Sequence, residues 1–80
     1  MEYDKNMSKS NYSKEYQNLL EQLKKARENS GLTQKEVSEK LKKPQSYISK
    51  CESGERRVDP VELKMFAKIY NKQINYFLEK

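Results

Sequence analysis

The chain of 80 residues is predicted to fold as one all-α domain of five short helices. Apolar residues recur at three- and four-residue spacing over several stretches, which is typical of helices that bury one face. Capping-box patterns precede two of these stretches. The chain has only two Gly and two Pro, and each of them lies at an expected helix boundary. With 34% hydrophobic residues the core is expected to be small but contiguous.

The first helix is expected to run from about Lys14 to Asn29. Its apolar stripe consists of Tyr16, Leu19, Leu20, Leu23 and Ala26. Gly31 is suited to the left-handed position that ends a helix, with Leu32 folded back onto the last turn. Residues 1–13 are polar and aperiodic, so we expect a flexible N-terminal tail followed by a folded domain over 14–80.

The second helix is expected over about 33–41, because Thr33 and Glu36 have capping-box spacing. The third helix is expected over about 44–53, with Pro44 at the first helical position and Gly54 beyond its end. The fourth helix should begin at Pro60, after a second capping box formed by Asp59 and Glu62, and run to Tyr70. Asn71 is a plausible left-handed stop, and Ile74, Phe77 and Leu78 are assigned to a short fifth helix.

Composition excludes several classes of function. The chain has one Cys and no His, so it lacks the ligands of a usual His/Cys metal site and the partners of a Ser-His or Cys-His nucleophile. We therefore expect no enzyme activity and no cofactor. There is no apolar run of the length of a membrane span and no signal-peptide core. A single free Cys51 suits a reducing compartment, so a cytoplasmic location is expected.

Residues 33–54 have the layout of a helix-turn-helix, in which the second helix lies in the DNA major groove. That second helix carries small polar residues where a solvated helix would normally carry dense charge. Gln can hydrogen-bond adenine, Lys guanine, and Ser either base. Residues 33–57 contain 7 basic and 4 acidic groups, so the positive charge is concentrated on this unit. A polar face can also be merely solvated, but its place in this layout favours contact with double-stranded DNA.

From Leu23 to Leu78 the chain resembles the lambda-repressor-like, Cro/cI-type helix-turn-helix family. The resemblance is carried by Arg27, Gly31-Leu32-Thr33-Gln34, Val37, Leu41, Gln45-Ser46, Ile48-Ser49, Glu52, Gly54, Arg56-Arg57 and the apolar pattern of the fourth helix. It implies a five-helix DNA-binding domain, usually a homodimer, that acts as a repressor, an activator or an antitoxin-type autoregulator. Two positions depart from the family. Lys42 replaces a frequent turn Gly, and Pro44 replaces a Ser or Thr that would cap the third helix.

The resemblance also implies roles for individual residues. Gln34 would contact a phosphate and the adjoining base edge. Bases would be contacted by Gln45, Ser46 and Lys50, with Ser49 as a further candidate. Phosphates would be held by Tyr47, Ser53 and Arg56, and Lys43 is counted with the DNA-contacting residues for its charge. For Tyr47 the alternative is that it packs sideways on the second helix and touches no DNA.

Two further expectations concern structure and assembly. Arg27 and Glu52 are expected to form a partly buried ion pair between the first and third helices, a pair that the family places at these positions. The dimer interface is expected over the C-terminal segment, with the residues Tyr70, Ile74, Tyr76, Phe77 and Leu78. The alternative is that this segment simply closes the core of the monomer.

The predicted function is a transcriptional regulator, repressor or autoregulator, that binds a short palindromic operator with its third helix. The alternative is an antitoxin-like or adaptor module that uses the same fold to bind a protein partner.

Overall fold

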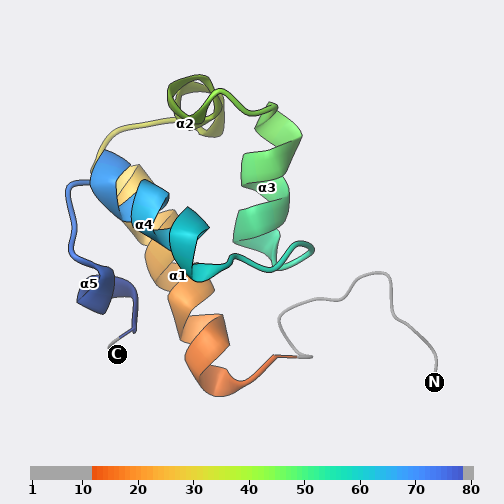
Figure 1. Ribbon diagram of the computed structural model, residues 1–80, viewed down its shortest axis with the longest axis vertical. Helices are drawn as coiled ribbons and strands as arrows, with labels where there is room; N and C mark the ends of the chain where they lie inside the picture. Colours follow the sequence, from red (N-terminus) through yellow and green to blue (C-terminus); the bar gives the residue numbers. More distant parts are fainter. Residues whose placement is uncertain (1–11, 79–80) are drawn as a thin grey trace.

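The computed structural model describes residues 12–78, and this part of the chain consists of helices and turns without a strand. The five helices are α1 (Lys14–Asn29), α2 (Gln34–Leu41), α3 (Gln45–Ser53), α4 (Pro60–Ile69) and α5 (Ile74–Leu78). In the view of Figure 1, α4 lies in front of α1 near the middle, with α3 at one side and α5 at the other. The all-α prediction is confirmed.

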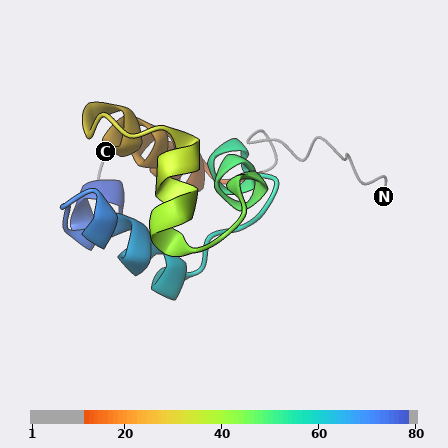
Figure 2. The ribbon, with the colours of Figure 1, turned by 90° about the horizontal axis from the view of Figure 1, so that it is seen from above.

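The helices enclose one hydrophobic core, to which α1, α2, α3, α4 and α5 all contribute. Its members are Leu19, Leu20, Leu23, Ala26, Val37, Ile48, Cys51, Leu63, Phe66, Ala67, Tyr70 and Phe77. Seen from above, α2 crosses the bundle between α3 and the C-terminal helices (Figure 2). Helix α3 packs mainly on α2 and α1, whereas α5 packs mainly on α1. One face of α3 is therefore anchored in the domain, and the opposite face is left free.

The residues that follow the helices adopt the backbone conformations expected from the local sequence. After α1, Gly31 is left-handed, with φ 74°, and the Leu32 N–H donates to the Arg27 carbonyl at 3.2 Å, which gives a Schellman end. Lys42 takes the same left-handed conformation after α2, with φ 59°, although it carries a side chain. Asn71 does so after α4, with φ 57°. The left-handed conformations predicted at Gly31 and Asn71 are therefore present, and Lys42 takes the conformation of the turn Gly that it replaces.

Both predicted capping boxes are formed. The Thr33 hydroxyl accepts from the Glu36 N–H at 3.0 Å, while Glu36 Oε1 accepts from the Thr33 N–H at 2.8 Å. Asp59 and Glu62 repeat this exchange at 2.8 and 2.9 Å. Such reciprocal bonds satisfy two backbone donors that a helix start otherwise leaves unpaired. These bonds fix the starts of α2 and α4 relative to the turns that precede them.

Three helix boundaries differ from the prediction by one residue. Thr33 is the N-cap of α2, which begins at Gln34. Pro44 is the extended N-cap residue of α3, with ψ 154°, and makes no side-chain cap, so α3 begins at Gln45 rather than at Pro44. A proline satisfies either position, because its fixed φ is compatible with both and its missing N–H costs nothing at a helix start. Tyr70 is the C-cap of α4, which ends at Ile69.

The folded domain begins earlier than the predicted residue 14. The Ser13 hydroxyl caps α1 by accepting from the Tyr16 N–H at 3.1 Å. The Tyr12 hydroxyl donates to the Gly54 carbonyl at 2.6 Å, and its ring lies 4.6 Å from that of Tyr16. Arg57 stacks on both rings, at 4.9 and 4.7 Å from their centroids. Tyr12 and Ser13 therefore belong to the domain, while the rest of the predicted tail, residues 1–11, lies outside the described residues.

Candidate DNA-contacting surface

Helix α3 separates its residues cleanly between core and solvent. Ile48 and Cys51 are fully buried and Glu52 is 6% exposed, which anchors one side of the helix in the domain. Tyr47 is half-buried, and the five other residues of the helix are polar and exposed, namely Gln45, Ser46, Ser49, Lys50 and Ser53. We call these five residues the polar face of α3. It presents amide, hydroxyl and ammonium groups to solvent, which are the groups that hydrogen-bond base edges and phosphates.

The C-terminal half of α3 is held by a buried carboxylate. Arg27 of α1 donates to both oxygens of Glu52, from Nε at 2.7 Å and from Nη2 at 3.2 Å. A third nitrogen, Nη1, donates to the Leu32 carbonyl at 2.9 Å. The two side chains are 11% and 4% exposed. The hydrogen bonds to Glu52 raise the pKa of Arg27 above its ordinary value, so the guanidinium keeps its charge.

Gln34 lies in the same network at the start of α2. Its Nε2 donates to Glu52 Oε1 at 3.0 Å. A shallow hollow beside this contact is lined by Lys24, Gln34, Ser49, Glu52 and Ser53. Three residues that were predicted to contact DNA, Gln34, Ser49 and Ser53, therefore lie together although they come from two helices. Lys24 of α1, which was not predicted, lies beside them. The buried Glu52 orients Gln34 toward the polar face of α3.

The N-terminal turn of α3 is organised around Tyr47. Its ring stacks on Phe66 of α4, with centroids 6.5 Å apart and an interplanar angle of 12°. Two cations lie over the ring, Lys43 Nζ at 5.2 Å and the Arg56 guanidinium at 4.7 Å, within the range of a cation–π contact. Three residues predicted to contact DNA are therefore neighbours at this end of α3.

The hydroxyl of Tyr47 donates to Glu62 Oε2 at 2.7 Å, and Arg56 Nη1 lies 2.7 Å from the same oxygen. The hydrogen bond from Arg56 lowers the pKa of Glu62 to about 2. Burial raises the pKa of Tyr47, and its bond to Glu62 raises it further. One interpretation of Tyr47 was that it packs sideways within the domain, and the structure shows such packing. Its ring and hydroxyl contact Phe66 and Glu62, which belong to α4 rather than to α2.

The five residues expected at a dimer interface do not share one environment. Tyr70 and Phe77 are 3% and 0% exposed, so at these two positions the segment closes the core of the monomer, as the alternative for this segment predicts, and little of either side chain is left for a second copy. Ile74 and Tyr76 are half-buried, and Leu78 is 57% exposed. The apolar surface left on α5 is therefore smaller than the sequence suggested.

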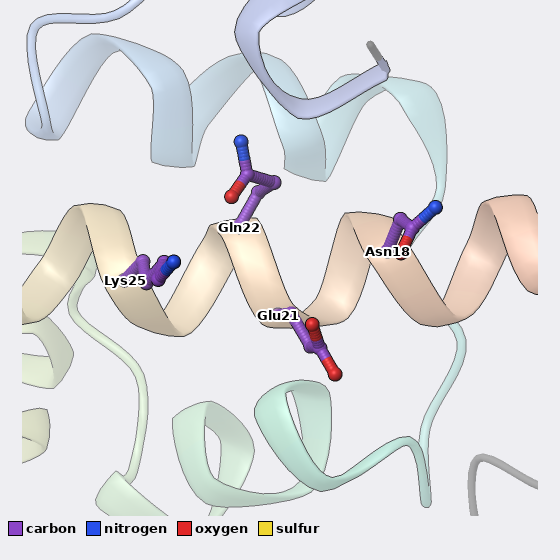
Figure 3. Close-up of a pocket in the computed structure, with 4 residues that line it drawn as sticks. All are labelled: Asn18, Glu21, Gln22 and Lys25. Carbon is purple, nitrogen blue, oxygen red and sulfur yellow. The ribbon is translucent and has the colours of Figure 1, made fainter. Parts of the chain in front are cut away.

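A second hollow lies along α1 and is lined by Asn18, Glu21, Gln22 and Lys25. Figure 3 shows that all four side chains come from this helix, with Gln22 pointing toward the C-terminal helices. The Gln22 amide donates to the Tyr76 carbonyl at 3.4 Å, which links α1 to α5. None of the four was predicted to be functional.

Comparison with known proteins agrees with the geometry. The chain matches the helix-turn-helix family over residues 23–77, and it therefore belongs to this Cro/cI-type family of DNA-binding proteins, which are typically not enzymes. No curated protein and no solved structure matches the chain. Within residues 12–78, no group of three potential ligands gathers to hold a metal ion. No helix in that part of the chain is long and apolar enough to cross a membrane.

Proposed function

We propose that the protein is a sequence-specific regulator of transcription that inserts α3 into the major groove of an operator. The observation that carries the proposal is the polar face of α3. This helix is anchored from behind by Ile48, Cys51 and Glu52, and its five outward residues carry neutral polar groups and one ammonium group. A face that is merely solvated normally carries dense charge, whereas this face has a single charged side chain, Lys50.

The assignment of roles follows the geometry. Gln45, Ser46, Ser49 and Lys50 are exposed on successive turns of α3 and would contact base edges. Lys43 and Arg56 flank its first turn and would attract phosphates. At the other end, Gln34, Ser53 and Lys24 border the hollow beside Glu52 and would contact the opposite strand of backbone. Phosphate contacts on both sides of a recognition helix set its register in the groove.

One recognition helix contacts too few base pairs to mark a unique site among about a million competing ones. A homodimer on a palindromic operator would double the contacted sequence, with half-sites separated by roughly 34–36 Å. Leu78, Ile74 and Tyr76 supply the partly exposed apolar residues for such a contact. Sedimentation of the wild type should show a dimer at micromolar concentration, weakened by Tyr76→Lys and by Leu78→Lys. A dimer indifferent to both substitutions would exclude α5 as the interface.

The experiment that tests DNA binding is selection from a randomised duplex pool, followed by titration of selected and random duplexes at two salt concentrations. Binding to both should weaken steeply with salt, because phosphate contacts release counterions. A preference for the selected duplex at both salt concentrations supports the regulator. Absence of salt-dependent binding would favour the other class, a module of the same fold that binds a protein partner.

A further inference from the structure

The carboxylate of Glu62 has more partners than its place in a capping box requires. Oε1 accepts the Asp59 N–H at 2.9 Å, which completes the box at the start of α4. Oε2 accepts the Tyr47 hydroxyl and the Arg56 guanidinium, both at 2.7 Å. One side chain, 14% exposed, thus connects α4, the loop after α3 and the first turn of α3.

The first turn of α3 needs such a connection. Its N-cap is Pro44, which makes no side-chain hydrogen bond, so this end lacks the anchor that a Ser, Thr or Asp supplies elsewhere in the chain. The Tyr47 N–H donates to the Pro44 carbonyl at 3.0 Å, and this is a local bond that does not attach the turn to the rest of the domain. In addition to the buried Ile48, Tyr47 attaches the turn to the domain through its ring on Phe66 and its hydroxyl on Glu62.

Glu62 also restrains a cation. Arg56 lies over the Tyr47 ring and its side chain is 43% exposed while paired with Glu62. An unpaired guanidinium here would bind any phosphate regardless of sequence, since phosphate contacts carry no sequence information. The pairing limits this attraction and keeps the guanidinium at one place beside α3.

We propose that Glu62 is a positioning residue for DNA discrimination, which orients the first turn of α3 through Tyr47 and restrains Arg56 without touching DNA itself. The inference rests on the proposed function, because it needs a preferred operator. A purely structural role of Glu62 would predict that its loss weakens binding to the operator and to random DNA alike, whereas a positioning role predicts different effects on the two. Loss of the carboxylate should weaken binding to the operator but leave binding to random DNA unchanged or stronger.

Glu62→Gln is the informative variant. Glutamine preserves the acceptor that a capping box requires, but it places an amide donor where Oε2 accepted from Tyr47 and Arg56. The matched control is Glu36→Gln, since Glu36 makes the same reciprocal bonds with Thr33 at the start of α2. Both variants lose one negative charge and retain the cap, and only Glu62 bonds to Tyr47. Tyr47→Phe removes the hydroxyl alone and keeps the ring stacked on Phe66.

The measurement is the ratio of affinities for the selected operator and for a random duplex, with each variant first shown to be folded by circular dichroism. We expect Glu62→Gln to lower this ratio at least fivefold relative to Glu36→Gln, with an affinity for random DNA at or above that of the control. Tyr47→Phe should lower the ratio by several-fold.

The inference is overturned if Glu62→Gln and Glu36→Gln give the same ratio, if both affinities of Glu62→Gln fall by the same factor, or if Tyr47→Phe retains the wild-type ratio. If Glu62→Gln does not fold, Tyr47→Phe decides alone. A wild type that selects no operator would refute the proposed function instead, so the two failures are distinguishable.

Discussion

Removal of the Arg27 guanidinium tests whether the buried ion pair holds α3 to α1. Arg27→Met keeps much of the side-chain volume and leaves Glu52, whose side chain is 4% exposed, with the Gln34 amide as its remaining partner at 3.0 Å. Breaking a buried pair by removing one partner costs about 3–5 kcal/mol. Small domains are stable by only about 5–15 kcal/mol, so the substitution should remove a large part of the stability.

The free energy of unfolding should be measured by urea denaturation at pH 7, followed by circular dichroism. In thermal unfolding the same loss should lower Tm by roughly 12–40 °C, because each kcal/mol shifts a domain of this size by about 4–8 °C. The matched control is Lys35→Met, which removes an exposed ion pair with Glu39, 69% and 64% exposed. Exposed pairs contribute about 0–1 kcal/mol. A loss below about 1 kcal/mol for Arg27→Met, or one equal to the control, would refute the reasoning.

Three smaller effects follow from the helix ends and the Glu62 cluster. Lys42→Gly should stabilise the domain by up to about 1 kcal/mol in urea denaturation, since a left-handed residue with a side chain is strained. Asn71→Gly should increase the stability less, because Asn tolerates this conformation. Thr33→Ala should cost about 1 kcal/mol, because it removes the N-cap of α2; an unchanged denaturation midpoint would contradict the role of the cap. The pKa of Glu62 is lowered to about 2, so its contribution is complete above the unfolded pKa of about 4.3 and is lost as pH falls toward 2. Because Arg56 is 43% exposed and screened, we expect a loss on the order of 1 kcal/mol over this range, absent in Glu62→Gln.

The sequence predicted the elements whose signals are local. Thr33 and Asp59 precede residues of the right type at the right spacing, and a capping box needs nothing beyond those few residues. The left-handed ends at Gly31 and Asn71 follow from the same short-range chemistry. The boundary at Pro44 was displaced by one residue, because a proline fits both the N-cap and the first helical position.

Contacts between residues far apart in the chain were harder to predict. The Tyr12 hydroxyl bonds to a carbonyl 42 positions away, and no pattern within residues 1–13 indicates that partner. The sequence predicted the capping role of Glu62. It did not indicate that the second carboxylate oxygen accepts a hydrogen bond from Tyr47 of α3. Tyr70 and Phe77 were expected at a dimer interface, because the apolar character of a residue does not reveal whether the same chain or a second copy covers it. The Arg27–Glu52 pair was anticipated through the family resemblance.

The most direct test of the central claim is to repeat the selection from a randomised duplex pool with Gln45→Ala. Gln45 is exposed at the start of α3, where a bidentate contact with a base contributes about 1–3 kcal/mol of discrimination. The control Lys43→Ala should weaken binding to all duplexes alike and leave the selected sequence unchanged. We predict that Gln45→Ala selects the wild-type operator with the preference relaxed at one position in each half-site. A selected sequence identical to that of the wild type at every position would contradict base contact by α3.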